Sequence, residues 1–520
     1  MDWTQDWSGL KCDGKRTVTR RRVDLDSLPP EILEVILSEL LATDPLFARF
    51  LRRVDQAWAA LANRLVTSLL VPPWPAPFDL ATRLPNIQFI SINISDIQIT
   101  CSAQLAALFA QLAELPSLLS LAACGAGSDA AASFSCLSRL SRLTALDLSH
   151  SELPELPSTL SSLTALQVLR AYDCGLTRLA PDTSTAAPST ASAEASPPPA
   201  PLLPPGLRSL ELGGNRLSSL PDWVSRLSCL RCLQLGDNCL AGAGALEAVL
   251  VAAGERLREL DVSGNSLGSP PGGLACAARL TKLDLADCDL ASLEGWDVGA
   301  MKELSQLNLS GNWRLAHCPA ALTALTALTQ LDLSGCGLTC LPACLGDCSQ
   351  LQLLHLSAND LHCLPACVSR LSSLRQLHLD YNSLTALPSW LAALSALTCL
   401  DAAGNALREL PRELGRLTAV RHLALGSNRL AALPACLYDM SGLQELDLSC
   451  NRLAALPGCL CSRLPRLDFL SLYGNQLSRL PPQLTRLRRL AWLDAADNRL
   501  QDVPPQLTRM TALQVLKLRG

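Results

Sequence analysis

The chain has 520 residues, of which 49% are apolar and 17% charged, and its formal net charge is -4. This slightly negative charge argues against nucleic acid or an anionic membrane as the main partner, and no uninterrupted apolar run reaches the length of about 18 residues that a membrane helix needs. Because the first 25 residues lack the apolar core of a signal peptide and the 22 cysteines form no terminal clusters, we expect reduced thiols in a cytoplasmic protein, with the nucleus as a second compartment.

Two segments precede the repetitive part of the chain. Residues 1–25 carry charges throughout and are predicted to be a disordered tail. Residues 26–66 instead show helical apolar spacing at Ile32, Ile36 and Leu40, after two prolines that a first helical turn tolerates. We predict a compact unit of three helices over residues 26–66.

The helical segment resembles the F-box, the module by which a substrate receptor docks onto the Skp-type adaptor of a cullin-based ubiquitin ligase. The residues that carry the resemblance are Leu28, Pro29, Glu31, Ile32, Leu33, Ile36, Leu37, Leu40, Asp44, Leu46, Val54 and Trp58. The resemblance implies that the adaptor is bound by Leu28, Pro29, Ile32, Leu33 and Ile36. Asp55 departs from the family, which usually has Cys or another small residue there. The alternative is a helical cap that only shields the first coil of the following repeats, as solenoids require for solubility.

After a proline-rich connector at residues 67–83, the rest of the chain repeats. Residues 328–442 contain five lines of 23 residues with apolar side chains at positions 1, 4, 6, 11, 14 and 18, Asn at position 9 in all but the first line, and Pro at position 15. The pattern is degenerate from residue 84 to about residue 142 and regular from residue 143. Alternation around position 4 predicts a short strand, and the Asn supplies a donor and an acceptor where the backbone turns away from that strand. A single coil cannot fold alone, so stacked coils must share their leucines.

This pattern resembles the leucine-rich repeat, and the regular coils are similar to those of the cytosolic Ras-group repeat proteins. The resemblance implies an α/β fold over residues 84–520: a right-handed leucine-rich-repeat solenoid with a parallel β-sheet on its concave face, preceded by the three-helix unit. Residues 181–205 interrupt one coil with Pro, Ala, Ser and Thr and show no periodicity. We predict that they form a disordered insertion.

The side chains at the outward positions of the concave strands are not needed for the apolar core, so they form the candidate binding surface. Asp recurs at position 5 and makes this face acidic, although repeats of this family often carry Asp there. Aromatic residues make up only 4% of the chain, so their gathering in the later coils predicts a protein-binding hot spot. The residues of this predicted patch are His355, His378, Tyr381, His422, Phe469, Tyr473 and Trp492.

Two other groups have the chemistry of metal ligands. His355, His378 and Asp401 share one row, whereas a CxxxC pair recurs one coil later at Cys340, Cys344, Cys363 and Cys367. The first group lies on an open sheet, and the repeat itself generates the second, so we expect no metal and no cofactor. The sequence shows no Ser/His/Asp set in a credible pocket and no phosphate-binding loop. We therefore expect that the chain is not an enzyme.

Two classes of function remain. In the first, the chain is the substrate-recognition subunit of a cullin-based ubiquitin ligase, whose helical unit binds the Skp-type adaptor and whose concave face binds an unidentified target protein. In the second, it is a cytosolic leucine-rich-repeat signalling scaffold whose N-terminal helices only cap the solenoid. The regular 23-residue coils favour the second class, because F-box repeat proteins commonly have longer, cysteine-rich coils. Neither class requires a nucleic acid or a membrane as partner.

Overall fold

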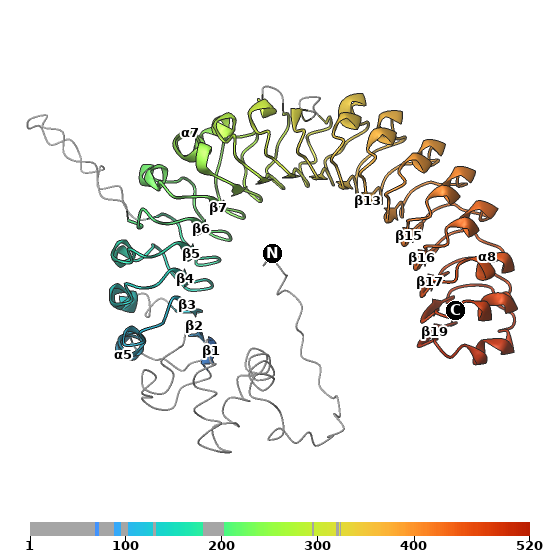
Figure 1. Ribbon diagram of the computed structural model, residues 1–520, viewed down its shortest axis with the longest axis horizontal. Helices are drawn as coiled ribbons and strands as arrows, with labels where there is room; N and C mark the ends of the chain where they lie inside the picture. The colour runs from blue at the N-terminus through green and yellow to red at the C-terminus, as the bar shows by residue number, and fades with distance from the viewer. Residues whose placement is uncertain are drawn as a thin grey trace, which may run out of the picture.

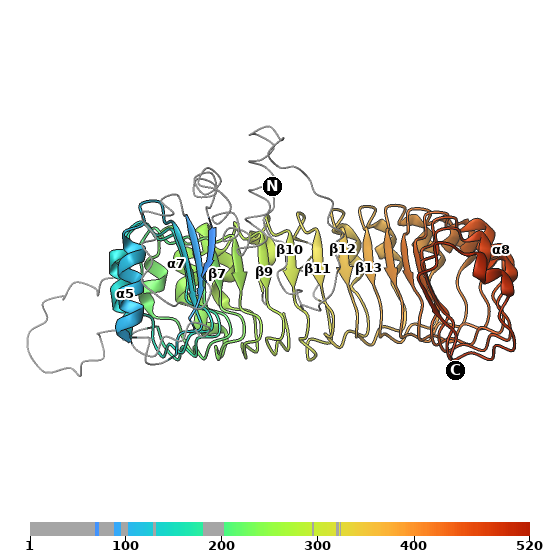
Figure 2. The same ribbon diagram turned by 90° about the horizontal axis from the view of Figure 1, so that it is seen from below.

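The computed structural model describes residues 68–71, 88–94, 102–127, 132–179, 202–293, 296–318, 322 and 324–519. In this part the chain forms one curved solenoid, with the strands on the inner edge of the arc and the helices on the outer edge (Figure 1). Seen from below, the strands stand side by side along the concave face (Figure 2). The predicted α/β solenoid with a parallel concave sheet is therefore confirmed. The predicted tail and three-helix unit, residues 1–66, lie outside the described residues.

One sheet of 19 strands extends through the described residues, and each strand pairs in parallel with the next one along the chain. The strands are β1 (Ser68–Val71), β2 (Phe89–Asn93), β3 (Ser120–Cys124), β4 (Ala145–Asp147), β5 (Val168–Arg170), β6 (Ser209–Glu211), β7 (Cys232–Gln234), β8 (Glu259–Asp261), β9 (Lys282–Asp284), β10 (Gln306–Asn308), β11 (Gln330–Asp332), β12 (Leu353–His355), β13 (Gln376–His378), β14 (Cys399–Asp401), β15 (His422–Ala424), β16 (Glu445–Asp447), β17 (Phe469–Ser471), β18 (Trp492–Asp494) and β19 (Val515–Lys517).

Short helices close the coils on the convex side. The α-helices of the described residues are α5 (Ser102–Ala113), α7 (Glu247–Ala253) and α8 (Gly458–Arg463). The 3-10 helices span Ala132–Arg139, Ser158–Ser162, Asp222–Arg226, Ala243–Leu246, Gly254–Arg256, Gly272–Cys276, Val298–Ala300, Ala343–Asp347, Ala366–Arg370, Ser389–Ala393, Arg412–Arg416, Ala435–Asp439, Pro482–Arg486 and Pro505–Arg509. Within the described ranges, no helix combines the length and the apolar character that a membrane crossing needs.

The repeat pattern explains the path of each coil. In the coil that starts at Leu374, the six patterned leucines are almost fully buried and join the core of the solenoid: Leu374, Leu377, Leu379, Leu384, Leu387 and Leu391. Pro388 directly precedes the 3-10 helix Ser389–Ala393 and has φ -73°, within the range to which its ring restricts it. Apolar spacing thus builds the core, and the proline starts the return path.

Asn at position 9 connects neighbouring coils through buried hydrogen bonds. Asn405 Nδ2 donates to the backbone carbonyls of Leu379, Ala402 and Ala403 at 2.9, 3.2 and 3.0 Å. Its Oδ1 accepts a hydrogen bond from the backbone N of Leu384 at 2.9 Å. The side chain therefore satisfies backbone groups of its own coil and of the preceding one. This agrees with the prediction that the Asn supplies both a donor and an acceptor where the backbone turns.

Cysteine takes this position in three coils. The Sγ atoms of Cys174, Cys288 and Cys336 each donate to a backbone carbonyl of the preceding coil, at 3.2, 3.2 and 3.1 Å. Burial raises the pKa of these thiols, to about 11 for Cys174 and to about 12 for Cys288 and Cys336. They are therefore protonated donors at neutral pH. No disulfide joins cysteines of the described residues.

Two boundaries differ from the sequence-based ones. Strand β1 lies inside the segment 67–83 that we expected to be a connector, and it pairs with β2, with Ser68 opposite Phe89. The apolar stretch before the first proline is thus long enough to extend the sheet. At the end of the predicted insertion 181–205, Leu203 is fully buried and belongs to the core. The regular coil resumes there because its return path needs a buried leucine. Residues 181–201 lie outside the described residues.

Candidate functional site

From β4 to β18, the concave face is built by three-residue strands whose middle leucine is buried. In β13, Leu377 is buried, whereas Gln376 and His378 on either side are accessible. Neighbouring strands pair residue for residue, at a spacing of about 4.8 Å. Side chains at one repeat position therefore form a row across the sheet. One row consists of position 3 and the other of position 5.

Four adjacent members of the position 3 row form what we call the aromatic row: His422, Glu445, Phe469 and Trp492 in β15 to β18. The rings of Phe469 and Trp492 stack with 5.9 Å between their centroids and 23° between their planes. His422 Nδ1 lies 2.9 Å from Glu445 Oε2. Both aromatic side chains are half-buried. The row therefore presents apolar surface that is already held in place by neighbouring strands.

Two further contacts border the aromatic row. Lys517 Nζ lies 4.7 Å from the ring centroid of Trp492, in cation–π geometry, and 3.3 Å from Asp494 Oδ2. Tyr473, which is 39% exposed, forms a hydrogen bond with Asp497, and this bond together with the charge of Asp497 raises the pKa of Tyr473. Its hydroxyl is therefore a neutral donor or acceptor at the edge of the row.

The histidines of the predicted patch form a separate pair. The rings of His355 and His378 stack with 4.2 Å between their centroids and 7° between their planes. Burial, and then the charge of His355, lower the pKa of His378, so that its neutral form is favoured. Tyr381 is 68% exposed and has φ 53°. A Cβ on Gly404 of the next coil would lie 2.8 Å from the Tyr381 ring, so glycine permits this close approach.

The structure therefore divides the predicted residues between two places on the arc. His355, His378 and Tyr381 belong to β12, β13 and the turn that follows β13, whereas the aromatic row and Tyr473 belong to β15 to β18. Strand β14, which carries Asp401, lies between the two groups. The sequence described one patch, and the sheet shows two clusters of side chains. The predicted adaptor-binding residues Leu28, Pro29, Ile32, Leu33 and Ile36 lie outside the described residues.

A group with the chemistry of cation ligands lies at the histidine pair. One ligand atom each of His378, Asp380 and Asp401 lie within 4.8 Å of one another, and all three residues are half-buried. His355 is not part of this group, although the sequence placed it in one row with His378 and Asp401. Ser357 Oγ donates to Asp380 Oδ1 at 2.5 Å. Such acidic groups are common on open surfaces, so the absence of a metal site stays a prediction.

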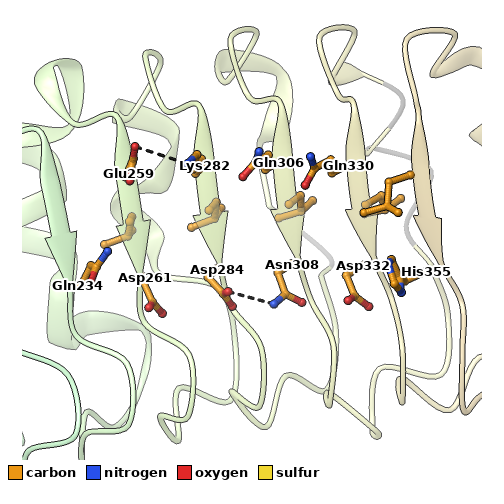
Figure 3. Close-up of a pocket in the computed structure, with 15 residues that line it drawn as sticks. Gln234, Glu259, Asp261, Lys282, Asp284, Gln306, Asn308, Gln330, Asp332 and His355 are labelled. Carbon is orange, nitrogen blue, oxygen red and sulfur yellow. Dashed lines mark hydrogen bonds and ion pairs between the residues drawn. The ribbon is translucent and has the colours of Figure 1, made fainter. Parts of the chain in front are cut away.

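An acidic trough occupies the middle of the arc (Figure 3). Its floor follows position 5 through Asp261, Asp284, Asn308 and Asp332, and it encloses about 440 Å³. Asn308 Nδ2 donates to Asp284 Oδ2 at 3.0 Å. Burial raises the pKa of Asp284, and the neighbouring charges of Asp261 and Asp332 raise it further. Like charges thus accumulate on this surface, which favours a cationic partner.

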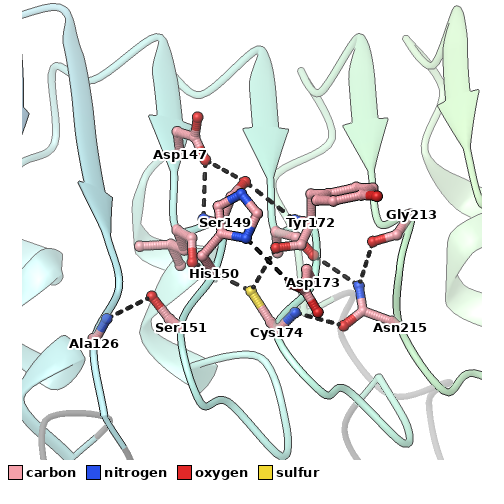
Figure 4. A network of polar contacts seen from close by, with 12 residues as sticks. Ala126, Asp147, Ser149, His150, Ser151, Tyr172, Asp173, Cys174, Gly213 and Asn215 are labelled. Atoms are coloured by element: carbon pink, nitrogen blue, oxygen red, sulfur yellow. Dashed lines mark hydrogen bonds and ion pairs between the residues drawn. The ribbon is translucent and has the colours of Figure 1, made fainter. Parts of the chain in front are cut away.

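A third cluster near the start of the arc was missed by the sequence analysis (Figure 4). The rings of His150 and Tyr172 meet edge to face at 5.7 Å, and His150 Nδ1 lies 3.3 Å from Asp173 Oδ2. Tyr172 is 45% exposed, and a Cβ on Gly213 would lie 3.1 Å from its ring. Tyr172 occupies position 7, as Tyr473 does. The same criterion applied to the earlier coils would have found it.

Comparisons with known proteins agree with this architecture. Models of the leucine-rich repeat match residues 418–477 and 441–500, and residues 256–277 and 327–348. A protein of Arabidopsis thaliana named for disease resistance is 32% identical over 143 residues, which are 26% of this chain and 16% of the relative. Among solved structures, a leucine-rich-repeat protein of Leptospira interrogans is 23% identical, with a TM-score of 0.62 over 85% of this chain and 100% of that chain. The functional domain of InlJ from Listeria monocytogenes is 20% identical, with a TM-score of 0.51 over 75% of this chain and 70% of that one.

The fold and the repeat matches together show leucine-rich repeats that are stacked into a solenoid. The repeats support a role in protein interaction. The chain spans only 16% of the length of the Arabidopsis thaliana relative. The structural likenesses, all at low identity, show the fold alone.

Proposed function

We propose that the chain binds a target protein across its concave face, with the aromatic row as the main anchor. The observation that carries this proposal is the stacked, half-buried pair of Phe469 and Trp492 on the accessible side of the sheet. Large aromatic side chains dominate binding energy at protein interfaces because they bury much area at a small entropic cost. A pair that is already stacked loses still less freedom when a partner covers it.

The shape of the face suits a protein rather than a small molecule. The acidic trough is lined by residues from Gln234 in β7 to His355 in β12, a distance of about 24 Å at the usual strand spacing. Small-molecule sites are enclosed and mostly apolar, whereas this surface is long, open and polar. Its carboxylates complement Lys or Arg side chains of a target, which then reaches the aromatic row along the same sheet.

A comparison of variants by quantitative affinity purification tests this role. Phe469→Ala combined with Trp492→Ala is expected to weaken target binding by about 30-fold or more, because loss of an interface anchor costs at least about 2 kcal/mol. The matched control is Trp313→Ala, which removes an aromatic side chain that is 67% exposed but lies outside the strands. The proposal would be contradicted if the double variant bound the target as well as the unmodified chain does. It would also be contradicted if Trp313→Ala weakened target binding as much as the double variant does. Equal thermal unfolding of the three proteins confirms that the solenoid is intact.

We further propose that residues 26–66 join this target-binding solenoid to the Skp-type adaptor of a cullin-based ubiquitin ligase. The support is the sequence resemblance to the F-box through Leu28, Pro29, Ile32 and Ile36. In a binding assay with purified adaptor, the chain is expected to capture it, and Ile32→Asp with Ile36→Asp to abolish capture. Burial of an uncharged polar group without a hydrogen bond already costs about 2–7 kcal/mol, and an unpaired carboxylate costs more. Two carboxylates at the apolar interface should therefore prevent binding of the adaptor.

The alternative is a signalling scaffold in which residues 26–66 only cap the solenoid. The regular 23-residue coils favour this function. The same two substitutions separate the alternatives, since an adaptor-binding module loses the adaptor and keeps the target, whereas a cap loses thermal stability of the solenoid. Failure of the unmodified chain to bind the adaptor would refute the ligase role and leave target binding by the concave face unaffected.

A further inference from the structure

Five arginines line one small pocket at the edge of the sheet, in a chain whose overall charge is negative. We call it the arginine pocket, and its lining consists of Arg208, Arg231, Arg256, Arg258, Arg279, Ser228 and Cys229. It encloses about 220 Å³. None of these residues belongs to the aromatic row, the acidic trough or the histidine pair. The pocket is therefore separate from the proposed target-binding surface.

The coil register brings these arginines together. Arg208, Arg231 and Arg258 each occupy position 2, directly before strands β6, β7 and β8. The backbone N of Arg231 donates to the Arg208 carbonyl at 2.8 Å, and that of Arg258 to the Arg231 carbonyl at 2.7 Å. The three side chains thus start from adjacent rungs, about 4.8 Å apart. Arg256 and Arg279, which directly precede Leu257 and Leu280 in the sequence, also line the pocket.

Most of the positive charge in the pocket is not compensated. Arg258 forms an ion pair with Glu303 and donates to the backbone carbonyl of Arg279 at 3.2 Å. Among the described residues, no carboxylate forms an ion pair with Arg208, Arg231, Arg256 or Arg279. These four side chains are exposed. Like charges held this close repel one another, so an anion between them relieves the repulsion.

We propose that the arginine pocket binds a multiply charged phosphate group, from either a free polyphosphate or a phosphorylated segment of a protein. Arginine presents a planar fork of N–H donors that matches phosphate oxygens in pairs, and it stays charged at all physiological pH values. A single phosphate would neutralise only part of the cluster, whereas linked or neighbouring phosphates contact guanidinium groups on successive rungs. The hydroxyl of Ser228 adds a neutral donor to the same lining.

Calorimetric titration of the full chain tests the proposal with two probes, sodium tripolyphosphate and a doubly phosphorylated serine peptide. Loss of charge-assisted hydrogen bonds predicts that Arg208→Ala with Arg231→Ala weakens binding by about tenfold or more. Arg231→Lys keeps the charge but loses the fork, so its effect is expected to be smaller. The matched control is Arg375→Ala: Arg375 is also an exposed position 2 arginine, but its neighbours on the adjacent rungs are Gln352 and Thr398.

Each result of the titration decides the proposal. Binding of either probe that is lost in the double variant and retained in Arg375→Ala supports it, and the probe that binds identifies the source of the phosphate. No binding of either probe up to about 1 mM overturns it. Equal weakening by Arg375→Ala also overturns it, because the attraction would then be a general effect of surface charge. Circular dichroism of each variant confirms that the fold is retained, as expected for exposed side chains.

Discussion

Removing one asparagine of the position 9 ladder should measure how strongly neighbouring coils are coupled. The perturbation is Asn405→Ala. Asn405 is only 8% exposed, and it makes four hydrogen bonds to backbone groups of two coils. Alanine removes all of them and leaves the apolar core residues unchanged.

The magnitude follows from what each partner retains. The carbonyls of Leu379 and Ala402 still accept hydrogen bonds from the position 9 asparagines of the coils on either side, at 3.1 and 2.9 Å. The carbonyl of Ala403 still accepts from the backbone N of Tyr381 at 2.9 Å. Leu384 N–H, by contrast, loses its acceptor, and an unsatisfied buried donor costs about 1–3 kcal/mol. With a small loss at each carbonyl, we expect a decrease of about 2–4 kcal/mol in the free energy of unfolding.

Urea unfolding followed by circular dichroism measures this loss, and hydrogen exchange of the Leu384 amide locates it. Asn405→Cys should lose less than Asn405→Ala, because Cys336 shows that a thiol at this position donates to a carbonyl of the preceding coil. Glu409→Ala is the control, since Glu409 is an exposed residue of the same coil, and it should change stability by no more than about 0.5 kcal/mol. If Asn405→Ala behaved like this control, with unchanged exchange at Leu384, the ladder would not couple the coils.

Three further predictions concern glycines in turns, a half-buried carboxylate and the predicted insertion. Gly404 has φ +63° and faces the Tyr381 ring, whereas Gly242 has φ +74° and open space around it. Gly242→Ala should therefore lower the free energy of unfolding by about 1 kcal/mol through backbone strain, and Gly404→Ala should lower it further because the added Cβ also meets the ring. Urea unfolding midpoints measure the difference between the two variants. The raised pKa of Asp284 means that the folded state disfavours its charged form, so Asp284→Asn should stabilise the protein at pH 7 and have little effect below the unfolded pKa of about 3.9; an equal effect at both pH values would contradict this. Deletion of residues 182–200 should change stability by less than about 1 kcal/mol, whereas Leu203→Ala should cost about 2–5 kcal/mol, and a larger loss on deletion would show that the insertion packs.

A repeat position that is shared by neighbouring coils places its side chains side by side, as the sequence analysis predicted for His355 and His378. Phe469 and Trp492 share position 3, and His355 and His378 share position 5, so the parallel register places each pair on adjacent strands. The rings of both pairs indeed stack. The division of the patch into two groups could also have been read from the sequence, because Cys399–Asp401 between them contains no aromatic residue.

The arginine pocket shows why position 2 was overlooked. Only positions that face outward from the concave strands were considered as binding surface, and Arg208, Arg231 and Arg258 precede those strands. Three consecutive arginines at one position are visible in the sequence once the coils are aligned. That Arg256 and Arg279 turn toward the same cavity depends on how the ends of two coils of different length pack, which no repeat pattern specifies.

By itself, the sequence determined the path of each coil, because leucine spacing, the position 9 asparagine and the proline act within about 23 residues and satisfy local burial and backbone hydrogen bonding. Contacts between side chains at different repeat positions depended on the tertiary structure. In the tertiary structure Leu203 belongs to the core, β1 extends the sheet, Asp380 lies close to His378 and Asp401, and five arginines line one pocket. The reason is physical: each coil buries its leucines against its neighbours, so contacts between coils depend on their lengths and stacking rather than on the pattern within one coil.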